Sequence, residues 1–391
     1  MNQFAIRLLV YSHKFDIRRF RFASGFLFVY NIANNIAKVF YAMKSPIAFF
    51  SKNIGIDLGT ANTLIYLAGR GIIANEPSVA AVNNKTGHVL AIGEEAKKMI
   101  GRTPAHINVV RPLVGGVISD FDMTQELLRH LLKKVVGSKV FYNFKHAVIG
   151  VPSNLTEVER KSVEDAVIGA GVSKAYVIEE PLAAALGARL PIDEPTANMI
   201  VDIGGGTTEI AVISMGGTVT AKSLKIAGDK LNDDIIRFIR DEFRLAIGEP
   251  TAEELKISIG SAIPMDQKME LMIRGRDLAT GLPKEAVVKD THVRAAIVKS
   301  LKSIVETIKE VVELSPPELA GDILRRGIYL CGGGSLLKGM DVLLARELGV
   351  NTTVVDDPLT CVARGTGVAI ENLEKYKHIL DNPLRPRDIK I

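Results

Sequence analysis

The chain of 391 residues lacks tryptophan and contains only two cysteines, Cys331 and Cys361. Two cysteines cannot build the disulfide framework that stabilises small secreted domains, so we interpret them as buried thiols in a reducing compartment. No spacing of Cys and His that is typical of a structural zinc site is present. These shortages exclude a disulfide-rich or zinc-finger protein and favour an ordinary globular chain.

Excess charge is also scarce, because the formal net charge is only +5. The first 52 residues carry eight Lys or Arg and one acidic residue, a net charge of +7, which leaves −2 for the rest. The body of the protein is therefore slightly acidic, and no nucleic-acid groove is expected there. The length is sufficient for two domains.

Two segments combine an apolar strand, a carboxylate and a glycine-rich turn. They are residues 54–63, IGIDLGTANT, and residues 199–209, MIVDIGGGTTE. Glycine allows the close approach of a ligand, and successive backbone N–H groups in such turns bind anions. A carboxylate beside a phosphate requires a cation between them, and Mg²⁺ binds through one or two carboxylates, phosphate oxygens and water. The pair predicts two similar halves that close on one Mg-nucleotide, with Asp57 and Asp202 holding the hydrated ion from opposite sides.

Donors to the phosphates are expected from both turns. The first turn offers Thr60, Ala61 and Asn62, and the second offers Gly204, Gly205, Gly206 and Thr207. A third string, GIYLCGGGSLL at residues 327–337, repeats the pattern of strand, glycine turn and helix. A tight connection would explain it more simply, but three consecutive glycines cost much backbone entropy on folding.

These three strings, in this order, resemble the phosphate-1, phosphate-2 and adenosine motifs of the actin-like ATPase superfamily. Further motifs are similar to those of the MreB family, the bacterial actin homologues. The motifs are DLGTANT (57–63), NEPS (75–78), RP (111–112), GVP (150–152), IEEP (178–181), DIGGGTTE (202–209) and TGLP (280–283). The resemblance extends from about residue 53 to about residue 372 and does not cover the first fifty residues.

The resemblance implies an α/β, actin-like (ribonuclease H-like) fold with duplicated domains around a nucleotide cleft. The alternation of strands and helices agrees with this fold class. We expect an N-terminal extension at 1–50, domain I at 51–196 plus 366–391, and domain II at 197–365.

Local patterns predict the elements of the first half. The predicted strands are 53–58, 63–67, 72–75, 79–83, 89–92, 146–151 and 175–178, and the predicted helices are 94–101, 122–137 and 181–190. Thr156 and Glu159 have the spacing of a capping box at the start of another helix. A linker at 191–195 precedes a new strand at 198.

The resemblance also assigns roles at the site. It implies that Glu180 orients the water that attacks the γ-phosphate, with Thr207 and Asp202 assisting. Without the resemblance, the simpler interpretation would be that Glu179 and Glu180, at the start of a helix, complement the helix dipole. Actin carries a lysine in its first phosphate loop, and this chain has none between Asp57 and Arg70.

For the ribose and base, the resemblance implicates one helix and one turn. Their residues are Glu253, Glu254, Lys256, Gly333, Gly334, Ser335 and Leu336. Glu253 and Lys256 share a helix face, and on their own they would be read as a surface ion pair.

The implied function is a slow Mg-dependent ATPase that forms cytoskeletal filaments and determines bacterial cell shape by organising cell-wall synthesis. The implied partners are the protein itself in antiparallel filament pairs, the inner membrane, and wall-synthesis and scaffold proteins such as RodZ and MreC. The expected location is the cytoplasm, at the inner face of the cytoplasmic membrane. Two alternatives share the glycine turns, namely a small-molecule kinase and a heat-shock-type chaperone ATPase.

Two segments are candidates for membrane contact. The apolar loop around 137–145 contains Val140, Phe141, Tyr142 and Phe144, which insert into the membrane if the resemblance holds. The basic N-terminal segment has an uncharged stretch at 22–37, which is shorter than the roughly twenty residues of a membrane span. An interfacial helix is a reasonable interpretation of this segment, a spanning helix or secretory signal is less favoured, and residues 1–42 being untranslated is a further alternative.

Overall fold

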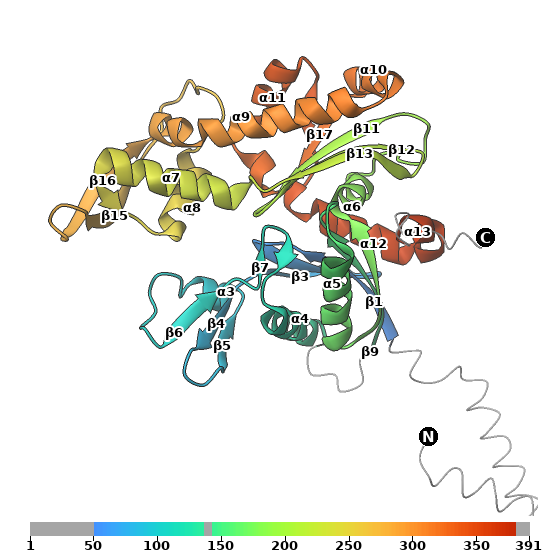
Figure 1. Cartoon of the computed structure of the whole chain (residues 1–391), viewed down its shortest axis with the longest axis horizontal. Coiled ribbons are helices and arrows are strands. Elements are labelled where there is room, and N and C mark those ends of the chain that lie inside the picture. The colour runs from blue at the N-terminus through green and yellow to red at the C-terminus, as the bar shows by residue number, and fades with distance from the viewer. Residues whose placement is uncertain (1–50, 137–142, 381–391) are drawn as a thin grey trace, which may run out of the picture. The chain divides into compact units, whose positions relative to one another are not determined.

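The computed structural model describes residues 51–136 and 143–380. The described residues from Lys52 to Leu380 belong to one compact unit. Its centre consists of two five-stranded sheets (Figure 1). The first sheet has the order β10-β9-β1-β2-β3, with β1 (Ser51–Leu58), β2 (Asn62–Leu67), β3 (Gly71–Pro77), β9 (Asn143–Val151) and β10 (Val172–Glu179). The second sheet has the order β13-β12-β11-β17-β18, with β11 (Asn198–Ile203), β12 (Thr208–Ser214), β13 (Gly217–Leu224), β17 (Ile328–Cys331) and β18 (Thr352–Val354).

The two sheets have the same topology. In each, the first strand is central, the next two strands extend an antiparallel meander from it, and two later strands lie on its other side. β1 and β11 are the two central strands. All six residues of β11 are buried, as expected for a strand covered on both faces.

Short strands extend this framework. One small sheet has β4 (Ala80–Asn83), β5 (Val89–Ile92) and β6 (Ile107–Val110), a second has β7 (Leu113–Val114) and β8 (Val117–Ile118), and a third has β14 (Leu245–Ala246), β15 (Glu270–Asp277) and β16 (Pro283–Lys289).

Helices cover the sheets and build separate apolar cores. The helices are α3 (Glu94–Lys97), α4 (Phe121–Val136), α5 (Glu157–Gly169), α6 (Glu180–Gly187), α7 (Gly228–Phe243), α8 (Glu249–Ile259), α9 (Asp290–Leu314), α10 (Pro317–Arg326), α11 (Met340–Leu348), α12 (Cys361–Glu371) and α13 (Leu373–Leu380), with short 3₁₀ turns η3 (Gly333–Leu336) and η4 (Pro358–Thr360). One core joins the first sheet to α4 and α5, and another joins the second sheet to α7, α8, α9 and α11.

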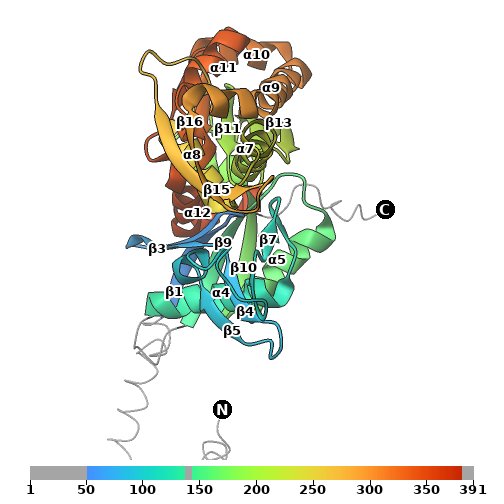
Figure 2. The same cartoon turned by 90° about the vertical axis from the view of Figure 1, so that its left-hand side faces the viewer.

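A third core lies around α6, α12 and α13 and includes residues of both sheets. Val148 and Ile178 come from the first sheet, and Ile200 and Ala211 come from the second. Figures 1 and 2 show α12 between the two sheets. This shared core connects two halves of the molecule, the first half built on the first sheet and the second half built on the second sheet. It also places the start of α6 beside the ends of the central strands.

Most predicted elements of the first half agree with the structure. The five strands predicted between residues 53 and 92 correspond to β1–β5, and a new strand begins at Asn198 after the predicted linker. The capping box is confirmed, because Thr156 accepts from the Glu159 N–H and Glu159 accepts from the Thr156 N–H. The helix predicted at 94–101 is shorter than expected, since α3 ends at Lys97 and a turn follows.

One membrane residue was predicted wrongly. Phe144 is only 5% exposed and packs in the core of the first sheet, where it pairs with Val172 across β9 and β10. It is therefore not part of an exposed loop. Val140, Phe141 and Tyr142 lie outside the described residues. Among the residues that the structure describes, no helix is long and apolar enough to cross a bilayer.

Candidate functional site

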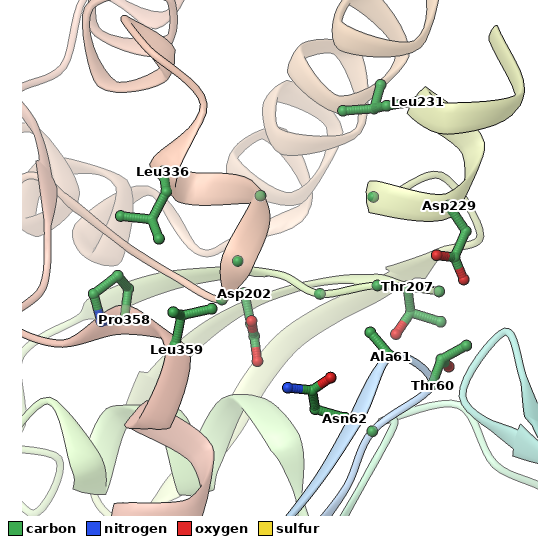
Figure 3. Close-up of a pocket in the computed structure, with 18 of the residues that line it drawn as sticks. Thr60, Ala61, Asn62, Asp202, Thr207, Asp229, Leu231, Leu336, Pro358 and Leu359 are labelled. Carbon is green, nitrogen blue, oxygen red and sulfur yellow. The ribbon is translucent and has the colours of Figure 1, made fainter. Parts of the chain in front are cut away.

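A cavity of about 480 Å³ lies where the central strands of the two sheets end. Most of the predicted site residues line it. They are Asp57, Thr60, Ala61, Asn62, Glu180, Asp202, Gly204, Gly205, Gly206, Thr207, Glu253, Lys256, Gly333, Gly334 and Leu336. Figure 3 shows Asn62 and Asp202 extending into the cavity from different sheets.

Two predicted residues do not line the cavity. Glu254 is on the exposed face of α8. Ser335 is only 3% exposed, and its hydroxyl donates to the carbonyl oxygen of Gly332 at 2.7 Å. Ser335 therefore shapes the third glycine turn from within.

The first turn is held in place by the NEPS segment. The hydroxyl of Ser78 donates to the carbonyl oxygen of Gly59 at 2.6 Å, and its backbone N–H donates to Ala61 at 2.9 Å. The side-chain amide of Asn62 donates to Asn75 at 2.9 Å. These bonds fix the turn before any ligand binds.

The second turn is held by the start of α7 and lies close to the first turn. The N–H of Asp229 donates to the carbonyl oxygen of Gly205 at 2.8 Å. A Cβ atom at Gly205 would lie 2.6 Å from the Cβ of Ala61, which is too close for two carbon atoms. Glycine at this position therefore allows the turns of the two halves to meet.

The third turn lies against the carboxylate of Asp202. Gly332 has φ of 77°, and a Cβ atom there would lie 2.2 Å from Oδ1 of Asp202. Both the left-handed backbone and this contact require glycine. The third motif thus supports the second motif directly, across the parallel pair of β11 and β17.

Three carboxylates line the cavity, those of Asp57, Glu180 and Asp202, and the carboxylate of Glu209 lies close enough to act on the last two. Burial, followed by the charge of Asp202, raises the pKa of Asp57 to about 8. Burial, followed by the charge of Glu209, raises the pKa of Asp202 to about 7. Burial and the charges of the other three raise the pKa of Glu180 well above its usual range. Burial beside one another thus makes it costly for these carboxylates to carry their negative charges together.

This charge arrangement is compatible with a divalent cation. Within residues 51–136 and 143–380, no group of three or more His, Cys, Asp or Glu side chains is arranged to hold a metal by itself. A magnesium ion at Asp57 and Asp202 would therefore need further oxygen ligands from phosphate and water. Such an ion would offset the mutual repulsion of the carboxylates.

Basic groups lie toward the other end of the cavity, around α8. Nζ of Lys256 donates to the carbonyl oxygen of Gly228 at 2.8 Å, and burial lowers the pKa of Lys256. Lys97 of α3 forms an ion pair of 3.0 Å with Glu253. Because α3 belongs to the first half and α8 to the second, this pair connects the halves at the cavity wall.

Several lining residues were not predicted from the sequence. The N–H of Gly116, in the turn between β7 and β8, donates to Oγ1 of Thr60 at 3.0 Å. Pro358 and Leu359 form an apolar wall together with Leu336 (Figure 3). Asp229 also lines the cavity, and its place in the first turn of a helix was a signal that could have identified it.

Comparison with known proteins finds one family that matches most of the chain. The MreB/Mbl protein family matches residues 51–378. The cell shape-determining protein Mbl of Bacillus subtilis is 48% identical over 326 residues, which make up 83% of this chain and 98% of Mbl.

Two solved structures have the same fold. The crystal structure of MreB5 of Spiroplasma citri bound to AMPPNP is 39% identical, with a TM-score of 0.80, and the match covers 84% of this chain and 98% of MreB5. The MamK double helical filament is 25% identical, with a TM-score of 0.69, over 83% of this chain and 99% of MamK. These structures confirm the predicted actin-like fold class.

Proposed function

Because the chain belongs to the MreB/Mbl family, we propose that it is an ATP-dependent, filament-forming cytoskeletal protein that determines bacterial cell shape by organising cell-wall synthesis. The observation that carries the proposal is one cavity that contains both glycine turns, Asp57, Asp202 and Glu180. The proposal is also supported by Mbl, a relative named as cell shape-determining.

The proposed ligand is Mg²⁺-ATP, since MreB5 was crystallised with the ATP analogue AMPPNP. The two glycine turns would donate backbone N–H groups to the phosphates, and the wall that contains Leu336 and Leu359 would contact the base. Asp57 and Asp202 would hold the hydrated magnesium ion, which supplies positive charge to the phosphates when bound.

Glu180 is the residue proposed to act on water. Its side chain is 8% exposed and lines the cavity at the start of α6. As a carboxylate it accepts a hydrogen bond from the attacking water and orients it in line with the γ-phosphate. Thr207, which is 7% exposed and also lines the cavity, assists in holding this water. Hydrolysis is expected to be slow and to accompany polymerisation.

Self-association is the proposed route from nucleotide binding to function. The related MamK forms a double helical filament. A heterologous contact that does not close produces such a filament. For this chain we propose antiparallel filament pairs at the inner face of the cytoplasmic membrane, together with scaffold and wall-synthesis proteins such as RodZ and MreC.

Membrane attachment is proposed for Val140, Phe141 and Tyr142, with the basic N-terminal segment as a second anchor. Each apolar cluster binds weakly, but many clusters on one filament act at a high effective concentration. Replacing Val140 and Phe141 by Ser in the chain that starts at Met43 is expected to abolish co-sedimentation with liposomes while ATP hydrolysis persists. Unchanged lipid binding would remove this loop from the proposal.

Hydrolysis and polymerisation test the central proposal. The wild-type chain with ATP and Mg²⁺ is expected to release phosphate slowly and to sediment as filaments. Glu180→Ala should lose turnover and keep nucleotide binding, because the residue contacts water and not phosphate. Equal phosphate release by the two proteins would refute the role of Glu180, and a persistent monomer at high concentration with lipid present would favour a small-molecule kinase.

A further inference from the structure

A hydrogen bond joins the two halves at Glu179, the residue that precedes Glu180 in the chain. Thr218 is in β13 of the second sheet, and its hydroxyl donates to Oε2 of Glu179 at 2.9 Å. Glu179 is the last residue of β10 in the first sheet and the N-cap residue of α6. The bond therefore fastens the first turn of α6 to the second half of the molecule.

The carboxylate of Glu179 is held in a confined environment. Burial raises its pKa, while the bond from Thr218 and the charge of Arg160 lower it. Arg160 is itself only 7% exposed, and its Nε has no hydrogen-bond partner among the described residues. The guanidinium of Arg160, in α5 of the first half, thus attracts the carboxylate of Glu179. The hydroxyl of Thr218 holds the same carboxylate from the second half.

A second bond between the halves involves Glu209, whose charge acts on Glu180. The N–H of Ser153, just after β9, donates to Oε2 of Glu209 in β12 at 3.2 Å. The hydroxyl of Ser223 in β13 donates to Oε1 of the same carboxylate at 2.5 Å. The second sheet therefore contacts the first sheet at the ends of both β9 and β10, the two strands next to the start of α6.

We propose that Thr218 is a positioning residue for ATP hydrolysis, acting through Glu179 on its chain neighbour Glu180. Thr218 does not line the cavity, so it is not expected to contact the nucleotide. The bond fixes the start of α6 and with it the carboxylate of Glu180, and a shift of about 1 Å in a catalytic group can cost about 100-fold in rate. This inference rests on the proposed ATPase function.

Three substitutions in the full chain separate positioning from packing. Thr218→Val removes the hydroxyl and keeps the shape, and Thr218→Ser restores the donor. Thr220→Val makes the same chemical change two residues further along β13, at a side chain that is not a partner of Glu179 in the described part of the chain. The measurements are kcat and KM for phosphate release, the affinity for a fluorescent ATP analogue, and the melting temperature.

We expect Thr218→Val to lower kcat by about 10- to 100-fold, with KM and analogue affinity within twofold of wild type. Thr218→Ser should recover most of kcat, and Thr220→Val should match wild type. Equal kcat for Thr218→Val and Thr220→Val would overturn the inference. So would a parallel loss of analogue binding, or a Thr218→Ser variant as slow as Thr218→Val, because both outcomes indicate a packing role.

Failure of the proposed function gives a different result. In that case the wild-type chain itself releases no phosphate in the same assay, which overturns the function and this inference together. A second result would overturn this inference and leave the proposed function standing. In it, the wild-type chain hydrolyses ATP, Glu180→Ala abolishes turnover, and Thr218→Val leaves turnover intact.

Discussion

Gly365 lies where α12 crosses α6, and its replacement by alanine tests the packing of the shared core. A Cβ atom at Gly365 would lie 1.7 Å from the carbonyl oxygen of Ala183 in α6. The obstructing atom belongs to the backbone, so no side-chain rotation relieves the contact. The reciprocal contact is equally close, since a Cβ atom at Gly187 would lie 1.9 Å from the carbonyl oxygen of Cys361. The two helices would have to separate by more than about 1 Å to reach ordinary contact distances.

The expected magnitude follows from this separation. Overpacking a core typically costs about 1–3 kcal/mol, and we expect the upper end because both partners are helix backbones. Unfolding entropy of about 2.1 cal/mol/K per residue gives roughly 0.7 kcal/mol/K for a unit of about 330 residues. Gly365→Ala should therefore lower the melting temperature by about 4 °C.

Gly321→Ala is the matched control for this prediction. Gly321 lies in the middle of α10, and a Cβ atom there would have no neighbour within 4 Å. Alanine at such a site stabilises a helix by about 0.4–1 kcal/mol. Calorimetric melting of the two variants without nucleotide should show shifts of opposite sign. A Gly365→Ala variant that melts at or above the wild-type temperature would refute the reasoning.

Two further predictions concern charged groups. Lys97→Ala removes the ion pair with Glu253, and because both side chains are partly exposed the loss is at most about 1 kcal/mol. In stopped-flow measurements, nucleotide should dissociate up to about fivefold faster from Lys97→Ala than from wild type, and this difference should fade near 1 M salt. The control is Lys98→Ala, which changes a side chain that is 70% exposed and should match wild type. Identical rates for Lys97→Ala and wild type at low salt would contradict this prediction. The backbone N–H of Ala197 lowers the pKa of Asp322, so this carboxylate stabilises the fold above its ordinary pKa of 3.8 and loses that contribution as the pH falls through the lowered value. The advantage of wild type over Asp322→Asn in urea midpoints should shrink between pH 7 and pH 3, and a constant difference would count against the assignment.

The chemistry of the site was predictable because it resides in short strings. A strand that ends in a carboxylate and a glycine turn has one practical geometry, and Asp57 and Asp202 accordingly line the same cavity. The cavity-lining residues that were not predicted come from segments without such a pattern. Gly116 and Leu359 reach the cavity only through the packing of distant elements, which local sequence does not encode.

Phe144 shows how a local pattern misleads. Its neighbours suggested an exposed apolar loop, since connections are usually short and polar. β9 begins at Asn143, and pairing with β10 buries the side chain against α4 and α5. Burial was decided by a strand that follows almost thirty residues later, so the loop pattern alone could not reveal it.

The contacts of α12 with the first sheet determine when one face of this sheet is covered during synthesis. Thr366 and Gly367 of α12 pack against Gly55 and Tyr66, and Glu371 accepts a hydrogen bond from the Tyr66 hydroxyl at 3.1 Å. The partners are about 300 residues apart, which a ribosome translates in roughly 15–60 s. For that period the face of β1 and β2 that α12 covers has no partner, while the second sheet is being made. Exposed apolar surface of this kind promotes aggregation of nascent chains. The distance along the chain between β1 and α12 therefore sets how long the nascent chain exposes this face.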